Sequence, residues 1–238
     1  MAKSRFTIIL LAAFLMSCTG TIDNRLPPEP GVSRALAEQR TATLSDVRYA
    51  LDLHIPEDRQ QAVTGSVTMR FQRTAQGEPL VLDFRAPADH VRRVLIDGEP
   101  VAHSLPTDHI VIPDDALKTG EQSVTVEFRS TDDALNRRDG FLYALFVPDR
   151  ASTSFPLFEQ PDLKARYSLQ LTIPAHWQAL SNGELLTRAT DAEDSAMDEL
   201  IFAETLPISS YLFAFAAGEF SVESAERDGR TFRLFHRE

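Results

Sequence analysis

Hydrophobic and polar positions alternate with a period of two in the first half of this chain. Every second residue is hydrophobic over residues 47–55, and the same pattern runs through residues 63–71 except for one glycine. A period of two is typical of a strand with one face in the core and the other in solvent. The sequence therefore predicts two strands, and the short connection between them predicts that they pair as a hairpin.

Short hydrophobic segments continue this pattern toward the end of the chain. The dipeptides Asp97-Gly98 and Asp228-Gly229 are strong signals for two-residue hairpin turns. No long segment has helical periodicity, and only residues 33–39 allow a brief helix. Many short strands at regular spacing predict an all-β fold, either an antiparallel sandwich or a twisted, saddle-like pair of sheets. Further strands are expected at 80–84, 91–96, 109–113, 124–128, 167–173, 184–188, 200–203, 211–222 and 231–235.

An aromatic loop precedes the strand at 167–173. Its prolines, Pro148, Pro156 and Pro161, restrict their own φ angles and favour extended backbone in the residues before them, so the loop has a specified, non-helical path. Two interpretations of its aromatic side chains stay open: a patch that binds a sugar or peptide, and packing into the core, which is the commoner arrangement. The aromatic residues are Phe141, Tyr143, Phe146, Phe155 and Phe158.

The N-terminus has the features of a bacterial lipoprotein signal. Lys3 and Arg5 form a basic region, residues 6–16 are apolar, and Leu-Met-Ser-Cys at 15–18 resembles a lipobox. The apolar run is too short for a stable membrane-spanning helix. The sequence predicts a cleaved signal followed by lipid attachment; the alternative is an ordinary secretory signal with a cysteine there by chance.

The predicted signal divides the chain into three parts. Cleavage removes residues 1–17, and the new N-terminal Cys18 carries acyl chains that anchor the protein firmly. Thr19 is not the aspartate that often signals retention in the inner membrane, so the outer membrane of a bacterial cell envelope is the expected location. Proline-rich residues 18–43 predict a flexible tether, and residues 44–238 form the folded domain.

Charge and cysteine content exclude several classes of function. The 238 residues carry a formal net charge of −11, with 43% hydrophobic and 25% charged residues, which is typical of a globular domain. An acidic surface repels a phosphate backbone, so no nucleic-acid partner is expected. Cys18 is the only cysteine, which excludes an intrachain disulfide and a cysteine-based metal site.

No catalytic constellation is recognisable from residue spacing. The six histidines never form His-x-x-x-His, and His54, His103 and His109 are expected in solvent rather than as ligands. Glu159 and Asp162 are the nearest to an acid/base pair, but a local role in the turn around Pro161 is the more ordinary interpretation. We therefore expect no catalytic residue, metal ligand or cofactor site in this chain.

Three blocks of sequence follow one another along the chain: the first is 146–165, the second ends in Ser-Asn-Gly at 181–183, and the third is 206–220. Together they resemble the N-terminal domain of the aminopeptidase N family of zinc metallopeptidases, and with the opening strands the resemblance covers residues 44–238. The residues shared in the first block are Phe146, Pro148, Phe155, Pro156, Phe158, Pro161, Lys164 and Ala165.

The resemblance implies an all-β domain, a saddle-shaped antiparallel β-sandwich, that packs on a thermolysin-like catalytic domain. In the family that second domain holds zinc through a His-Glu-x-x-His motif, which these 238 residues do not contain. The parent enzyme would be a membrane-anchored hydrolase that removes N-terminal residues from peptide substrates. This chain is then expected to be its non-catalytic N-terminal domain, a truncated product or fragment that is inactive alone.

The same loop is where the family recognises the substrate amine. The family often has glutamine or glutamate where this chain has Leu145 and Val147, which flank Phe146 and cannot accept a side-chain hydrogen bond. Asp149 is the nearby group that could substitute. These four residues form the expected substrate-side loop. The alternative function is a stand-alone surface lipoprotein that binds a peptide or protein through the aromatic loop.

Overall fold

The computed structural model describes residues 29–237. The predicted signal peptide, Cys18 and the first part of the predicted tether lie outside the described residues. The elements are α1 (Arg34–Thr43), β1 (Leu44–His54), β2 (Thr64–Arg73), β3 (Leu80–Asp83), β4 (Val91–Ile96), β5 (Glu99–Pro100), β6 (His109–Ile112), β7 (Gly120–Arg129), β8 (Phe141–Tyr143), β9 (Arg166–Pro174), β10 (Gln178–Ser181), β11 (Leu185–Thr190), β12 (Met197–Phe202), β13 (Phe215–Gly218), β14 (Ser221–Arg227) and β15 (Arg230–His236).

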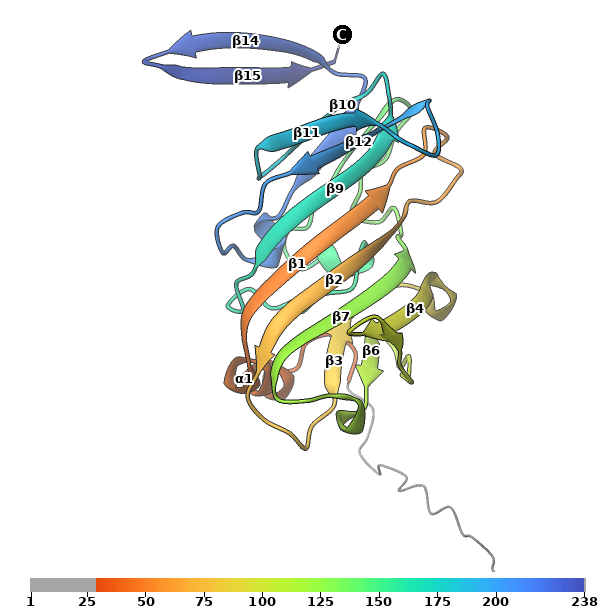
Figure 1. The fold of residues 1–238 in the computed structure, drawn as a ribbon, viewed down its shortest axis with the longest axis vertical. Coiled ribbons are helices and arrows are strands. Elements are labelled where there is room, and N and C mark those ends of the chain that lie inside the picture. The colour runs from red at the N-terminus through yellow and green to blue at the C-terminus, as the bar shows by residue number, and fades with distance from the viewer. Residues whose placement is uncertain (1–28, 238) are drawn as a thin grey trace, which may run out of the picture.

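The domain is built around one large sheet (Figure 1). Its eight strands lie in the order β11-β12-β9-β1-β2-β7-β4-β5, and two smaller sheets, β10-β13-β8 and β3-β6, accompany it. This arrangement confirms the predicted all-β sandwich. All neighbouring pairs in these sheets are antiparallel except β1 and β9, which run parallel. The long stretch of chain between these two strands makes a parallel pairing possible.

Burial along β1 and β2 follows the predicted alternation. All five hydrophobic residues of the 47–55 pattern are buried, as are the four hydrophobic residues of the 63–71 pattern, while the residues between them are partly or fully exposed. The two strands pair as predicted, with Leu51 opposite Val67. Both strands therefore present one apolar face to the core.

Aromatic rings join the large sheet to the smaller β10-β13-β8 sheet. Tyr167 of β9 stacks on Tyr49 of β1 at 4.9 Å between ring centroids, and on its other side it stacks on Phe213 at 4.6 Å. Phe213 in turn contacts Phe215 of β13 and Phe146. Such pairs stabilise a core beyond the area they bury. The interior of the sandwich therefore continues from β1 to the aromatic loop.

Both predicted two-residue turns are present. Asp97 and Gly98 have φ angles of 50° and 92°, and Asp228 and Gly229 have 51° and 70°. Positive φ at both central positions is the geometry of the hairpin turn that Asp-Gly favours. The first turn joins β4 to β5 and the second joins β14 to β15.

The predicted tether is wrong for its last ten residues, because Arg34–Thr43 forms helix α1. The Ser33 hydroxyl caps the helix by accepting a hydrogen bond from the Leu36 backbone N–H. The helix is held to the domain by Arg40, whose side chain is buried, and by Gln160, whose amide donates to a helix carbonyl at 3.1 Å. Tertiary contacts of this kind are invisible to local periodicity.

The alternation of hydrophobic and polar residues did not predict two short strands, and one predicted strand is interrupted. β8 lies inside the aromatic loop and β10 lies just before the Ser-Asn-Gly turn. The predicted strand at 211–222 consists of a 3-10 turn at Ser210–Leu212 followed by β13 and β14. Strands of three or four residues carry too few alternations to stand out from a loop.

The hairpin β14–β15 stands apart from the sandwich. Every residue of β14 is exposed, and Figure 1 shows the ribbon extending beyond the end of the large sheet. Phe232 and Leu234 of β15 are 55% and 59% exposed. A two-stranded ribbon is marginally stable by itself in water. The hairpin therefore gains little support from the core.

Candidate functional site

The substrate-side loop presents a stripe of exposed apolar side chains. Its residues alternate as in a strand: Phe146 is buried together with the side chains at 142 and 144, whereas Tyr143, Leu145 and Val147 are 44%, 43% and 51% exposed. The period of two that organises the sheets thus continues through the loop. We call Tyr143, Leu145 and Val147 the loop stripe.

Backbone hydrogen bonds hold the loop stripe in place. β8 pairs with β13, the N–H of Ala144 donates to the carbonyl of Phe215 at 2.9 Å, and the N–H of Leu145 donates to the carbonyl of Ala134 at 2.8 Å. The N–H of Arg150 donates to the carbonyl of Phe146. The loop is therefore bonded on both sides to the sandwich, and its exposed side chains sit on an anchored backbone.

Three of the five loop aromatics pack into the core. Phe146 and Phe155 contact each other edge to face at 5.7 Å, and Phe158 contacts Phe71 of β2 in the same way. All three loop rings are about 1% exposed. Core packing is therefore confirmed for them, and Tyr143 is the most exposed aromatic side chain of the loop.

Asp149 lies beside the loop stripe at the edge of a polar cavity. Its carboxylate is 3.8 Å from the guanidinium of Arg85, and its side chain is 67% exposed. The cavity has a volume of about 210 Å³, and Glu159 and Ser152 also line it. A carboxylate with this much exposure keeps access to solvent and to a cationic group. Its use in binding a substrate amine stays a prediction.

Glu159 and Asp162 do not form an acid/base pair in the structure. Glu159 is buried and accepts hydrogen bonds from the Ser152 backbone N–H at 2.6 Å and from the Ser210 hydroxyl at 3.0 Å, whereas Asp162 is exposed. Burial raises the pKa of Glu159, and these two hydrogen bonds partly oppose the rise. Glu159 therefore links two loops inside the domain, which is a structural role.

A buried ionic network lies beneath the loop, at the base of the same cavity. Asp83, the last residue of β3, accepts two hydrogen bonds from Arg40 of helix α1 at 2.7 and 2.8 Å. The sheet register places Asp83 opposite His109, the first residue of β6, and the two side chains approach to 3.1 Å. The Asp83 carboxylate also accepts from the Glu159 backbone N–H at 2.7 Å. The network therefore joins the helix, the β3-β6 sheet and the loop.

The expectation that His109 is solvated is wrong, because its side chain is fully buried. Its Nδ1 faces the Asp83 carboxylate, and its Nε2 donates a hydrogen bond to the carbonyl of Glu29 at 2.9 Å. An imidazole whose two nitrogens both face oxygen acceptors is best satisfied when both carry a proton. Sequence reasoning missed this partner because histidine and aspartate lie 26 positions apart. The sequence feature that could have indicated a buried ion pair is Asp83 itself, a charged residue inside the otherwise hydrophobic run 80–84.

The network shifts the pKa values of both titratable partners. Burial by itself raises the pKa of Asp83, but the adjacent His109 imidazole and the charge of Arg40 outweigh it, so the pKa of Asp83 lies below its ordinary value. Burial by itself lowers the pKa of His109, but its contacts with Asp83 and with the Glu29 carbonyl outweigh it, so the pKa of His109 lies above its ordinary value. Both shifts favour the charged pair.

Among residues 29–237, no helix has both the length and the apolar character that crossing a membrane requires.

The loop stripe and Asp149 offer exposed side chains for contact with a partner, and the network beneath them stabilises their position. The geometry therefore fits a binding or packing surface.

Comparisons with known proteins relate this chain to one family of peptidases. Residues 45–212 match the family model of the peptidase M1 N-terminal domain. Aminopeptidase N of Streptomyces lividans is 29% identical over 221 residues, a match that covers 87% of this chain and 25% of the relative. Glutamyl aminopeptidase of Rattus norvegicus is 33% identical over 89 residues, which cover 37% of this chain and 9% of the relative.

The solved structures add support for the fold. An M1 zinc metallopeptidase from Deinococcus radiodurans has a TM-score of 0.64 at 20% identity, over 77% of this chain and 44% of that one. Its likeness supports the β-sandwich alone. The chain spans about a quarter of the length of the Streptomyces relative. Because the family model matches most of the described domain, the chain belongs to the peptidase M1 N-terminal domain family.

Proposed function

We propose that this chain is the non-catalytic N-terminal domain of a membrane-anchored zinc aminopeptidase, in which it packs on a thermolysin-like catalytic domain and walls off the active site. The observation that carries the proposal is the family match over 45–212 in a chain that spans a quarter of an aminopeptidase N. The parent enzyme removes N-terminal residues from peptides. The zinc motif His-Glu-x-x-His does not occur in these 238 residues, so no residue of this chain is assigned to that metal.

The loop stripe is the surface that we assign to this packing. Its three side chains stand on an anchored backbone, and the charged residues Asp149 and Arg150 follow them after one proline. Exposed apolar patches with polar rims often mark interaction surfaces. Leu145 and Val147 cannot bind a substrate amine through their side chains, so their contribution is apolar contact. Asp149 supplies the carboxylate that would attract the amine.

A reconstitution experiment tests the packing surface. The remainder of the Streptomyces lividans enzyme, without the quarter that this chain matches, is mixed with residues 19–238 of this chain, and hydrolysis of aminoacyl-anilides is followed. We expect this chain to increase turnover. With the double variant Leu145→Asp/Val147→Asp, the increase in turnover should be smaller by at least about tenfold, since burying an unpaired carboxylate at an interface is costly.

Two controls make this result interpretable. Leu186→Asp changes an equally apolar, 60% exposed side chain on β11 and should leave the increase unchanged. As a positive control, the N-terminal quarter of the Streptomyces lividans enzyme is added back to its own remainder, which shows whether that remainder is competent for hydrolysis. If that quarter restores turnover and this chain does not, the packing proposal fails. Binding of peptides by this chain alone would instead favour the stand-alone surface lipoprotein.

We also propose that Cys18 anchors the mature protein to the outer membrane of a bacterial cell envelope. The proposal is supported by the basic, apolar and Leu-Met-Ser-Cys segments at the N-terminus. The variant Cys18→Ser should lose acyl label and move from the membrane to the soluble fraction, because no acyl chain can then attach. Wild-type protein that is equally soluble and carries no acyl group would support the ordinary secretory signal instead.

A further inference from the structure

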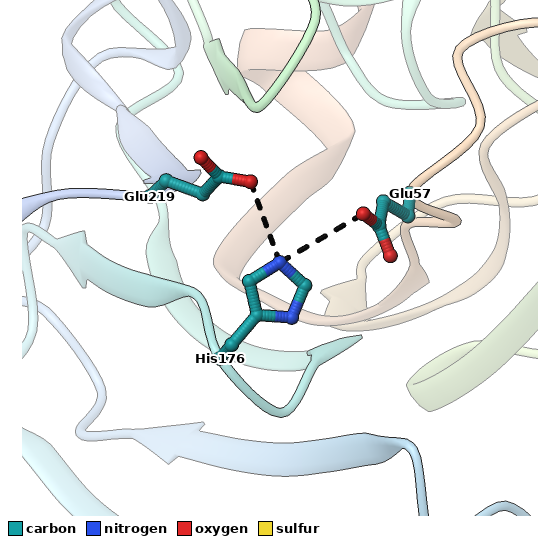
Figure 2. A group of neighbouring side chains, drawn as sticks. All are labelled: Glu57, His176 and Glu219. Atoms are coloured by element: carbon teal, nitrogen blue, oxygen red, sulfur yellow. Dashed lines mark ion pairs between the residues drawn. The ribbon is translucent and has the colours of Figure 1, made fainter.

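Three side chains from separate segments meet at one end of the sandwich, next to the root of the β14–β15 hairpin. Glu57 lies in the connection between β1 and β2, His176 in the turn between β9 and β10, and Glu219 in the short link between β13 and β14. Figure 2 shows the His176 imidazole pointing its Nε2 atom between the two carboxylates. Segments far apart in sequence therefore contribute one nitrogen and two oxygen ligands to one point.

The spacing of these three atoms fits a single small cation. The His176 Nε2 atom is 3.4 Å from Oε1 of Glu219 and 3.8 Å from Oε1 of Glu57, and the three ligand atoms lie within 4.8 Å of one another. A tetrahedral zinc ion with bonds of about 2.0–2.2 Å places its ligand atoms roughly 3.3–3.6 Å apart. Small side-chain rotations would complete that geometry.

The backbone around each ligand is anchored. The buried Arg137 side chain donates to the carbonyl of Pro56 at 2.6 Å, which fixes the residue before Glu57. The residue after His176 is Trp177, whose ring is buried. The N–H of Glu219 donates to the carbonyl of Gly140 at 2.8 Å. The three ligands therefore stand on fixed positions, which lowers the entropy that metal binding costs.

The two carboxylates of the cluster also favour the binding of a cation. Within the described residues, the ion pairs of Glu57 and Glu219 join them to His176, and no lysine or arginine pairs with either carboxylate. The two carboxylates bring two negative charges to the cluster, which a bound cation would offset. The two glutamates and His176 are between about half and two-thirds exposed, so water can occupy the remaining coordination position.

We propose that Glu57, His176 and Glu219 bind one Zn²⁺ ion. Imidazole nitrogen with carboxylate oxygen is a donor set that suits zinc, whereas calcium and magnesium prefer oxygen ligands alone. The ion would tie the β1–β2 connection and the β9–β10 turn to the segment that leads into the exposed hairpin. The proposed site is built from residues of this chain alone and does not depend on the proposed function.

Zinc titration of residues 19–238, followed by calorimetry, tests the site. Starting at Thr19 removes Cys18, whose thiol would bind zinc by itself. We expect one equivalent to bind to the wild type. His176→Gln should weaken binding by at least about tenfold, since even removal of a group that only supports a zinc ligand costs 10–100-fold. Zinc should also raise the Tm of the wild type and not of the variant.

A matched variant separates this site from general histidine binding. His103→Gln removes an exposed histidine whose Nδ1 contacts the Val101 carbonyl and which is not a member of the cluster, so this variant should bind zinc like the wild type. Glu57→Gln/Glu219→Gln should weaken binding as His176→Gln does. Unchanged affinity in both cluster variants, or no stoichiometric binding by the wild type, would overturn the proposal. Circular dichroism without metal verifies that each variant is folded.

Discussion

Replacing Asp83 by asparagine is expected to lower the free energy of unfolding by about 3–5 kcal/mol, because it removes one partner of a buried ion pair. The Arg40 guanidinium is 2% exposed and would lose the charge that compensates it. The variant also loses the carboxylate that faces His109 at 3.1 Å. Urea unfolding followed by circular dichroism measures the change.

An exposed ion pair provides the matched control for this result. Asp97 contacts Lys118 at 2.6 Å, but both side chains are about half exposed. Asp97→Asn should cost less than about 1 kcal/mol, since exposed pairs are screened by water and asparagine also accepts the positive φ of this turn. If Asp83→Asn costs no more than Asp97→Asn, the buried network does not stabilise the domain as we describe.

The same network gives the wild type a distinct pH dependence. The raised pKa of His109 means that its contribution to stability is complete below the ordinary histidine pKa of about 6.5 and is lost as pH rises through the raised value. The lowered pKa of Asp83 means that its contribution is present above its ordinary pKa and is lost as pH falls through the lowered value. The fall in stability above about pH 6.5 should disappear in Asp83→Asn.

Phe213→Ala is expected to cost about 3–5 kcal/mol, the range for truncating a buried phenylalanine. Phe213 is 1% exposed and contacts Tyr167 of the large sheet as well as Phe146 of the loop. Its ring therefore joins the two layers of the sandwich. Thermal and urea unfolding measure the loss, and the exposed apolar surface around the loop should increase.

The neighbouring residue is the control for Phe213. Leu212 is 49% exposed, so Leu212→Ala should change stability by no more than about 0.5 kcal/mol. The two substitutions lie one position apart and both delete an apolar side chain. Equal costs for the two would mean that the aromatic cluster does not hold the sandwich layers together.

The strand faces could be predicted because a strand needs only local alternation. In β1 and β2 the hydrophobic set is buried as expected, and the two Asp-Gly turns adopt the positive φ angles that this dipeptide favours. Both features depend on neighbouring residues alone. The family resemblance then supplied the sandwich, and the structure confirms it.

Features that depend on distant residues could not be predicted. Helix α1 lacks an apolar stripe and is fixed by Arg40, whose partner Asp83 lies 43 positions later. The parallel pairing of β1 with β9 joins strands separated by more than a hundred residues. The spacing of residues along the sequence predicts neither contact. The expectation of a tether that extends to residue 43 failed for this reason, and the parallel pair within the large sheet was not predicted.

The candidate site was predicted in part. The alternation through the loop makes Leu145 and Val147 exposed and Phe146 buried, so only the outward-facing residues can contact a partner. Spacing rules for metal ligands within one helix did not find the cluster around His176, because its ligands come from three different connections. Its glutamates meet the histidine only in the folded domain.

The most direct test of the proposed non-catalytic role is hydrolysis of an aminoacyl-anilide panel by purified residues 19–238, with and without added Zn²⁺. We predict no turnover above buffer in either condition, even when zinc binds at His176, because the His-Glu-x-x-His motif that activates water in the family does not occur in these residues. Turnover that follows this chain through purification and disappears with a chelator would contradict that role.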